Sequence, residues 1–299
     1  MTSLVPKDRG DDRIRTIRST SRLLNLPGSA VHTLLGLRTA ALTLAEPLDY
    51  AARYMNGKLR FPPLSLRRYA GPLATLEASG GEFLAYLKLL CQATADSRIL
   101  DIGCGFGLMA LALEPYLNGS GGYVGLDINH RAIDWANRTI SSRKRTFEFH
   151  HLDIRNGMYN PRGRLDADTV ALPLPQQSFD IVLLKSVFTH LRPAEVRNYL
   201  QQTALLLDRE GVGLATFFLL NDEQRARRAT NTIDFAFGDD IWRYSAREMP
   251  EVAVAYEQQA IVDMIAEAGL RLTAINYGSW SGLANGLSYQ DIVLFSRQP

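Results

Sequence analysis

Three glycines and two aspartates carry the strongest chemical signal in the sequence. Gly103, Gly105 and Gly107 alternate in "LDIGCGFG", after a short apolar run that ends near Asp101. A second apolar run, "YVGLDI", places Asp127 twenty positions beyond Gly107. Glycine lets the backbone approach a ligand closely, and a carboxylate at a strand end can accept two hydrogen bonds from a ribose diol. The spacing therefore predicts a site for a ligand that contains a ribose.

A nicotinamide dinucleotide fits this loop poorly. Its fingerprint is G-x-G-x-x-G, and Leu108 stands where the third glycine should be. Two further carboxylates are candidates to accept from the amino group of an adenine: Asp153 in "FHHLDIR" and Asp168 ahead of "LPLP". The sequence leaves the choice between Asp153 and Asp168 open. Cys104 lies between two loop glycines without an identifiable base, which favours a small semi-buried loop residue over a nucleophile.

Taken in order, these motifs resemble those of class I S-adenosylmethionine-dependent methyltransferases of the small-molecule type. The matching stretches are "LDIGCGFG", "GLDI", "HHLDI", "LPLPQQSFDIVLLKSVFTHL" and "LLLDREGVGLATFF", and the resemblance spans roughly residues 95–298. It implies an enzyme that uses S-adenosyl-L-methionine as cofactor. The order of several motifs makes this indication more specific than the glycine loop alone.

The resemblance also implies which residues bind the cofactor. They are Asp101, Gly103, Cys104, Gly105, Gly107, Asp127, Ile128, Asp153, Ile154, Lys185 and Ser186. In this assignment the glycine loop lies beneath the methionine part, with Asp101 near its amino group. Asp127 holds the ribose hydroxyls and Ile128 packs on the adenine. Residues 153–154 flank the base, and residues 185–186 lie beside the cofactor.

Short apolar runs alternate with helical periodicity from about residue 98 onward, which is typical of parallel βαβ units. Seven strands are predicted, at 98–103, 122–128, 147–154, 179–186, 211–219, 271–278 and 290–297. Helices are predicted at 108–117, 131–142, 193–207 and 253–270, the last with Gly269 as its C-cap. The resemblance implies a Rossmann-like, doubly wound α/β sheet of seven strands with a reversed last strand.

The chain divides into a basic helical extension or lid over residues 1–80 and a methyltransferase domain over residues 81–299. An acceptor-lid insertion is predicted at about 219–250. Residues 1–70 contain 12 Lys and Arg against 5 Asp and Glu, although the net charge of the whole chain is only +2. Two interpretations stay open: a solvated tail on an acidic body, or a lid whose arginines meet an anionic substrate or a membrane surface.

His190 in "SVFTHLRP" is the predicted catalytic residue, because it follows the fourth strand at the end of the sheet where an acceptor would meet the cofactor. It is either a base that takes a hydroxyl proton or a polar loop histidine that caps the following helix. His150 and His151 are adjacent in a strand and point to opposite faces, which argues against a shared metal ion. No metal site is predicted.

The predicted acceptor is a small molecule, with a hydroxyl group of a secondary metabolite or sugar-containing compound ahead of the alternatives. One alternative is carbon methylation of an isoprenoid such as a prenyl diphosphate, with a carbocation to stabilise. A second is a cofactor-binding regulator without turnover. Aromatic residues of the insertion would make a lipophilic pocket, or would simply pack around the last strand. They are Phe235, Phe237, Trp242 and Tyr244, with Tyr277, Trp280 and Tyr289 further on.

The composition limits which binding partners and which cellular compartment are expected for the protein. Cys91 and Cys104 are the two cysteines, so neither a disulfide framework nor a cysteine-rich zinc pattern is expected, and a cytoplasmic location is predicted. "YNPRG" at 159–163 resembles the Asn-Pro-aromatic motif of nucleic-acid amino methylases but is out of position. A nucleic-acid acceptor is therefore disfavoured, whereas peripheral contact with a membrane stays open. The sequence does not indicate the oligomeric state.

Overall fold

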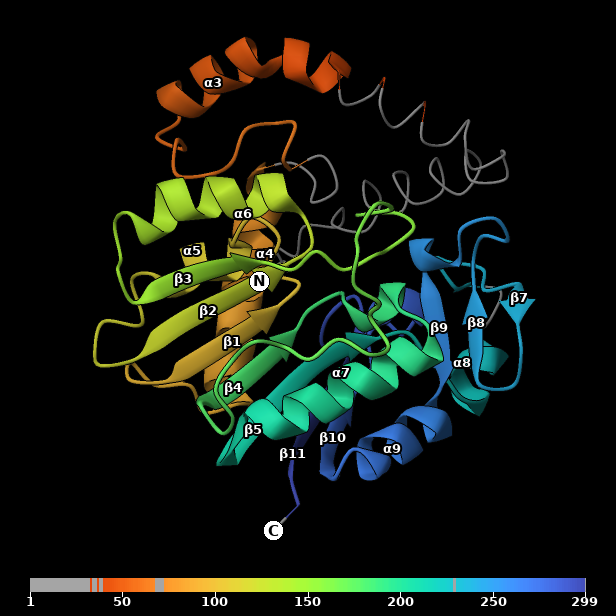
Figure 1. Cartoon of the computed structure of the whole chain (residues 1–299). Coiled ribbons are helices and arrows are strands. Elements are labelled where there is room, and N and C mark those ends of the chain that lie inside the picture. Colours follow the sequence, from red (N-terminus) through yellow and green to blue (C-terminus); the bar gives the residue numbers. More distant parts are fainter. Residues whose placement is uncertain (1–32, 34–36, 38–39, 68–72, 228–229, 299) are drawn as a thin grey trace, which may run out of the picture.

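The computed structural model describes residues 33, 37, 40–67, 73–227 and 230–298 (Figure 1). Its body is a seven-stranded sheet in the order β10-β11-β5-β4-β1-β2-β3. The strands are β1 (Arg98–Ile102), β2 (Gly122–Asp127), β3 (Phe147–His151), β4 (Phe179–Leu184), β5 (Leu207–Phe217), β10 (Leu270–Asn276) and β11 (Asp291–Arg297). β11 is antiparallel to both β5 and β10, whereas the pairs from β5 to β3 are parallel. The predicted α/β sheet with a reversed last strand is confirmed.

Helices cover both faces of this sheet, and a separate apolar core fills each interface. On one face lie α4 (Leu73–Leu89), α5 (Leu108–Leu113) and α6 (His130–Ala136), the last continued by a π-helical turn at Asn137–Ser141. On the other lie α7 (Pro193–Leu206) and α9 (Gln258–Glu267). The central strands are buried on both sides, which is why they read as continuous apolar runs rather than alternating ones. Gly269 has φ 75° directly after α9, as its predicted capping role requires.

The insertion after β5 builds a second, four-stranded sheet in the order β6-β9-β8-β7. Its strands are β6 (Leu219–Leu220), β7 (Phe237–Gly238), β8 (Trp242–Tyr244) and β9 (Val254–Glu257), with the short helix α8 (Asp222–Ala226) between β6 and β7. The prediction of a helix from residue 253 is wrong for its first turn. Val254 and Tyr256 are fully buried in β9, where pairing with β8 and β6 overrides the local helical pattern.

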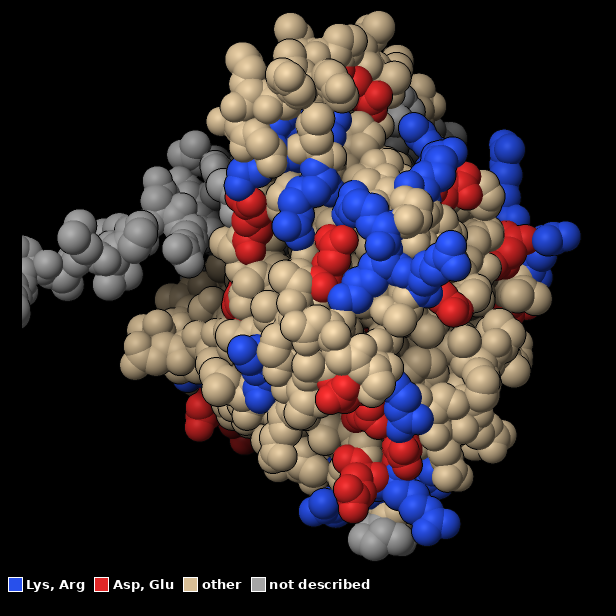
Figure 2. All heavy atoms as spheres, turned by 90° about the vertical axis from the view of Figure 1, so that its left-hand side faces the viewer, with Lys and Arg blue, Asp and Glu red and all other residues tan. Residues whose placement is uncertain are grey.

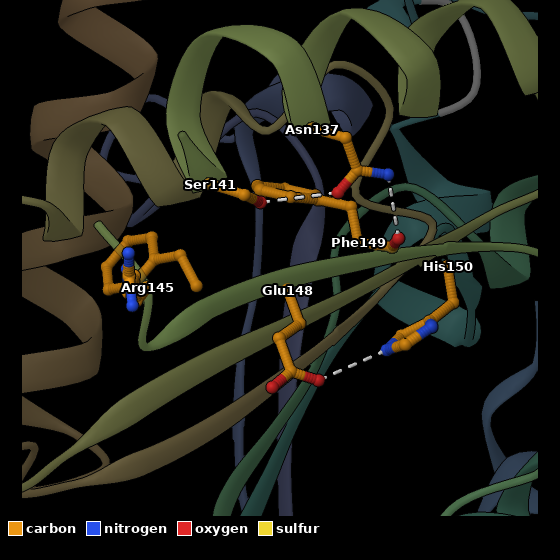
Figure 3. Close-up of a pocket in the computed structure, with 7 residues that line it drawn as sticks. Asn137, Ser141, Arg145, Glu148, Phe149 and His150 are labelled. Atoms are coloured by element: carbon orange, nitrogen blue, oxygen red, sulfur yellow. Dashed lines mark hydrogen bonds and ion pairs between the residues drawn. The ribbon is translucent and has the colours of Figure 1, made fainter. Parts of the chain in front are cut away.

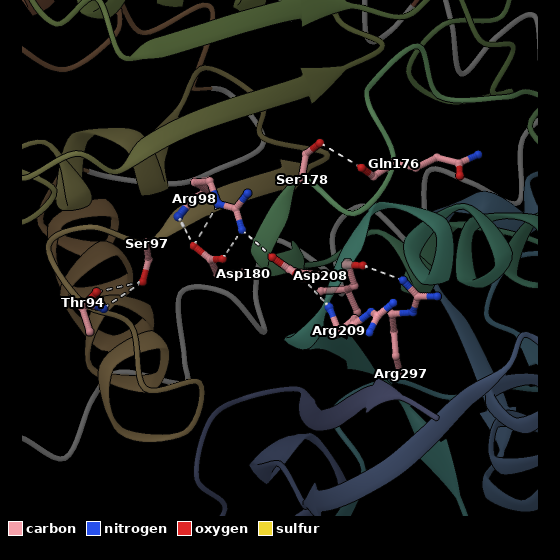
Figure 4. A network of polar contacts seen from close by, with 10 residues as sticks. Thr94, Ser97, Arg98, Gln176, Ser178, Asp180, Asp208, Arg209 and Arg297 are labelled. Carbon is pink, nitrogen blue, oxygen red and sulfur yellow. Dashed lines mark hydrogen bonds and ion pairs between the residues drawn. The ribbon is translucent and has the colours of Figure 1, made fainter. Parts of the chain in front are cut away.

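An ion network ties together the amino ends of three strands, opposite the predicted site (Figure 4). Arg98 at the start of β1 donates to Asp180 of β4 at 2.5 Å and to Asp208 of β5 at 2.7 Å. These carboxylates raise the pKa of the arginine. The groups are half-exposed, so the network fixes strand register more than it stabilises the fold.

The N-terminal region contributes α3 (Glu46–Met55), which lies outside the main sheet and its covering helices (Figure 1). The predicted boundary at residue 80 falls inside α4, and the domain division stays a prediction. The arginines at positions 9–22, which the lid hypothesis needs, lie outside the described residues. No helix in the described part of the chain is long and apolar enough to cross a membrane.

Candidate functional site

The glycine loop follows β1 and is shaped by left-handed backbone. Gly103, Gly105 and Gly107 have φ of 78°, 57° and 82°, which residues other than glycine adopt at a cost. A Cβ at Gly103 would lie 2.5 Å from a methyl of Val187, and one at Gly107 would lie 2.9 Å from the ring of Phe149. A Cβ at Gly105 would meet no atom of the described residues within 4 Å. The loop is therefore packed from below and open at Gly105, as a ligand cradle requires.

Asp127 at the end of β2 holds this loop in place. Its carboxylate accepts from the backbone N–H of Gly105 at 2.7 Å and from that of Asn129 at 2.7 Å. Burial raises the pKa of Asp127, and these two N–H groups act in the opposite direction. Each carboxylate oxygen keeps a second lone pair. Asp127 can thus organise the loop and still accept hydroxyl groups of a ligand.

Asp101 is a buried carboxyl beneath the loop. The Tyr123 hydroxyl donates to it at 2.6 Å. Burial raises the pKa of Asp101 to about 7, against the opposing effects of the Tyr123 hydrogen bond and the positive Lys185. A carboxyl with this pKa changes charge near neutrality, so it responds to any cation brought next to it.

Lys185 and Ser186 follow β4 and link the site to three other elements. Lys185 Nζ donates to Ser79 Oγ of α4 at 3.0 Å and lies over the ring of Phe83. Ser186 has φ 57°, and its N–H donates to Thr216 Oγ1 of β5 at 2.7 Å. Its hydroxyl reaches Gln290, just before β11, at 2.9 Å. The backbone turn after β4 is fixed by these contacts.

The residues predicted to lie around the adenine of the cofactor differ in how deeply they are buried. Ile128 is half-buried against the core and Ile154 is fully buried. The Asp153 carboxylate pairs with the exposed Arg164 at 2.5 Å, which lowers its pKa. Its rival Asp168 is exposed in a turn. The contact of either carboxylate with an adenine stays a prediction.

Cys104 packs beneath the neighbouring strand. Its Sγ would lie 2.8 Å from a Cβ added at Gly125 of β2, and burial raises the pKa of its thiol well above the ordinary value. It is therefore a thiol and a poor nucleophile at neutral pH. A larger side chain at position 125 would collide with it.

His190 ends a short 3-10 turn, Phe188–His190, at the carboxyl edge of the sheet. Its Nδ1 lies 2.8 Å from the backbone carbonyl oxygen of Glu251. A carbonyl only accepts, so Nδ1 carries the proton and Nε2 carries the lone pair of the neutral ring. Burial lowers the pKa of His190, which leaves the ring neutral at pH 7. This tautomer and charge state are those that a general base needs.

Two residues that support His190 were missed in the sequence. The ring of Tyr159 stands edge-on to the His190 ring, with centroids 5.4 Å apart. Glu251, which supplies the carbonyl, also binds Arg192 through its carboxylate at 2.8 Å. Tyr159 belongs to "YNPRG", a stretch noted only for a motif that was out of position. Its sequence neighbours gave no signal of a contact with His190.

Two of the seven aromatic residues singled out in the sequence, Phe235 and Trp280, are buried, whereas the other five are half-buried. Phe235 and Trp280 are buried in a small core with Phe218, and the Trp280 indole donates to Asp291 at 2.8 Å. The interpretation of these rings as acceptor-lining residues is wrong for Phe235 and Trp280. Ordinary packing around the reversed strand, the simpler of the two interpretations, describes them.

Buried polar atoms lie in the insertion, at Gln224 and Arg227, and in the turn before the last strand, at Ser281. Both amide atoms of the fully buried Gln224 lack hydrogen-bond partners among the described residues, as do Nε and one terminal nitrogen of Arg227 and the hydroxyl of Ser281. Hydrogen bonds link these residues, because the Arg227 N–H donates to the Gln224 carbonyl oxygen and the Thr230 hydroxyl contacts the carbonyl oxygens of Arg227 and Ser281. Buried polar groups normally have partners, so these atoms could serve a polar ligand.

A shallow depression of about 510 Å³ lies elsewhere, along the edge strand β3 (Figure 3). Residues that line it include Asn137, Ser141, Arg145 and His150. His150 faces Glu148 there, whereas His151 contacts the Ile128 carbonyl oxygen on the other side of the strand. None of the predicted cofactor residues lines this depression, so we do not assign the site to it.

Comparisons with known proteins identify the region that carries the loop. Residues 100–215 match the family model described as a methyltransferase domain. An uncharacterized methyltransferase, YcgJ of Bacillus subtilis, is 27% identical over 131 residues, which cover 44% of this chain and 44% of that protein. The demethylmenaquinone methyltransferase of Lactobacillus johnsonii is 32% identical over 112 residues, covering 38% of this chain and 40% of that protein. The chain thus spans less than half the length of these relatives.

The fold has a counterpart among solved structures. The PH0226 protein from Pyrococcus horikoshii superposes with a TM-score of 0.52 at 16% identity, covering 76% of this chain and 93% of that one. This likeness concerns the fold. The domain match by itself supports the resemblance to methyltransferases over residues 100–215, and S-adenosylmethionine is the cofactor that such a domain implies.

Proposed function

We propose that this chain, whose residues 100–215 match a methyltransferase domain, transfers a methyl group from S-adenosylmethionine to a hydroxyl group of a small molecule. The observation that carries the proposal is the glycine loop, which is open at Gly105 and bound through that residue's N–H to Asp127. When bound, the cofactor supplies an electrophilic methyl group. Displacement at that methyl needs alignment and exclusion of water more than it needs acid catalysis.

In this proposal the predicted cofactor residues keep the roles that the resemblance implies. Gly103, Gly105 and Gly107 let the backbone approach the methionine part, and Asp101 meets its ammonium group. Asp127 accepts from the ribose hydroxyls with the lone pairs that Gly105 and Asn129 leave free. A nucleoside fits these donors and acceptors.

His190 supports a hydroxyl acceptor. A hydroxyl group must lose its proton as it attacks, and neutral His190 has Nε2 available to take that proton because Glu251 fixes Nδ1 as the donor. Tyr159 restricts the orientation of the ring. Residues 219–250 would close over the acceptor. Gln224 and Arg227, which have side-chain atoms without partners among the described residues, would receive an anionic or hydroxyl-bearing end of it.

The affinity for S-adenosylmethionine is expected to rise with pH through neutrality. In the free protein Asp101 has a pKa of about 7, and a bound ammonium group favours its charged form, so binding below pH 7 must expel a proton. The dissociation constant should fall by up to about tenfold per pH unit between about pH 5.5 and 7 and then level off. Titrations across this range measure it. Asp101→Asn should give a flat profile, and an equally steep profile in that variant would contradict the assignment.

The proposed activity is tested by following the methyl group itself. The full chain is incubated with small-molecule extracts and S-adenosylmethionine carrying a deuterated methyl, and products are sought by mass spectrometry. We expect a species that gains one labelled methyl on oxygen. A label found on carbon would contradict the hydroxyl acceptor and favour methylation of an isoprenoid, and a label found on nucleic acid would contradict the small-molecule class.

A further inference from the structure

The helix α3 has its charged residues on the inside and its apolar residues on the outside. Between residues 40 and 57 every exposed residue is uncharged. The large apolar side chains are among the most exposed in the described part of the molecule: Leu44 is 84% exposed, Leu48 78% and Met55 77%. A helix on the surface of a globular domain normally shows the opposite pattern. The outer face of α3 is therefore built to meet an apolar partner.

The inward face explains how this helix stays attached. Asp49 forms a buried ion pair with Arg53 at 2.8 Å and a second one with Arg67. Arg53 also donates to the carbonyl oxygen of Phe61 at 2.8 Å, and Glu46 accepts from the Ser65 hydroxyl. All three charged side chains of α3 are used in these contacts. The orientation of the helix is thus set by polar contacts, and exposure of its apolar side chains Leu48 and Met55 is the consequence.

Basic side chains border this uncharged face. Figure 2 shows a mostly uncharged cap at the top of the molecule, with acidic atoms at its edge, and Lys and Arg side chains gathered beneath it among Asp and Glu side chains. Lys58 lies three residues beyond the end of α3 and pairs with Glu77, and Arg60 donates to the Leu111 carbonyl oxygen at 2.5 Å. Arg143 and Lys144 bind Glu114 at the end of the same helix, α5. An apolar face with a basic border matches the boundary between lipid chains and anionic headgroups.

We propose that α3 and the helical residues 40–44 before it form a docking surface for an anionic lipid bilayer. The leucines and Met55 would enter the interface, Tyr50 and Tyr54 would lie at headgroup level, and the basic border would face the phosphates. With 10 residues, α3 is too short to span a bilayer and would lie along it. This surface is separate from the glycine loop, so the inference does not depend on the proposed function.

Vesicle flotation with the full chain tests the inference. The wild-type protein should float with vesicles of phosphatidylcholine and phosphatidylglycerol, and less with phosphatidylcholine alone. Raising the salt concentration should weaken the binding to anionic vesicles. The double substitution Leu44→Ser and Leu48→Ser should reduce partitioning by about tenfold for each leucine. Because both side chains are exposed, the variant should keep the thermal midpoint of the wild type.

Leu89 gives a matched control, because it is 78% exposed at the end of α4 and lies outside α3. Leu89→Ser should leave flotation unchanged. Absence of flotation in the wild type, or equal flotation of the double variant, would overturn the proposal. So would a concentration-dependent dimer that the double variant abolishes without any binding to vesicles, since the face would then join two copies of the chain.

Discussion

Replacing His190 with glutamine is expected to lower kcat by about 10²- to 10⁴-fold on the acceptor that the labelled-methyl experiment identifies. The ring donates from Nδ1 to the Glu251 carbonyl oxygen at 2.8 Å, which leaves the lone pair of the neutral ring on Nε2. Burial keeps it neutral by lowering its pKa. Glutamine is polar and of similar length but cannot act as a base near neutrality, so the variant removes proton transfer and retains much of the packing.

The His190→Gln variant should lose turnover but keep its affinity for the cofactor. The affinity for S-adenosylmethionine should stay within about twofold of the wild type, because His190 contacts Glu251 and Tyr159, which are not predicted cofactor residues. The acidic limb of the wild-type pH–rate profile should report a group with a pKa below the ordinary value for histidine, and His190→Gln should abolish that limb. His130→Gln is the matched control, since His130 is exposed and pairs with Asp134. Full turnover in His190→Gln would rule out the proposed base.

Asp127→Ala is expected to weaken S-adenosylmethionine binding by about 100-fold or more. Hydrogen bonds to a charged group contribute about 1.5–3 kcal/mol each, and the proposed ribose contact contains two of them. The substitution also removes the acceptor for the Gly105 N–H, so the loop would lose its preorganisation. Equilibrium dialysis with labelled cofactor measures the effect.

Loss of folding must be distinguished from loss of binding in that experiment. Asp127→Asn keeps an oxygen for the Gly105 N–H and removes the charge, so its fold should be intact while its affinity falls by about tenfold or more. Asp134→Ala, at a half-exposed position on α6, should bind like the wild type. Unchanged affinity in both Asp127 variants would refute the ribose assignment.

The central strands were predictable because they are continuous apolar runs bounded by turn residues, as expected for strands buried on both faces. The edge strands β3 and β10 were predictable from the alternation of buried and more exposed residues. The glycine loop was equally visible, since only glycine readily tolerates left-handed backbone at positions that pack against Val187 or Phe149. These features are local in the chain or repeat with a fixed period. Sequence reasoning captures them for that reason.

The surroundings of His190 were not predictable in the same way. Glu251 is 61 positions away along the chain, and its contribution is a backbone carbonyl, which any residue type would supply. The strand at residues 254–257 forms because β8 and β6 flank it, so its local pattern misleads. The outward-facing apolar side of α3 depends on contacts with Arg67 and Phe61, which lie beyond the helix in the sequence. Each of these features depends on long-range contacts.

Calorimetric titration of the full chain with S-adenosylmethionine tests the central claim most directly. The geometry of the loop predicts saturable binding of one cofactor per chain, with a heat that depends on the buffer below pH 7 because Asp101, whose pKa is about 7, releases a proton. Asp127→Ala should remove most of the signal under the same conditions. Absence of saturable binding to the folded wild-type chain would contradict the account, since neither the cradle nor its carboxylates would then hold the cofactor.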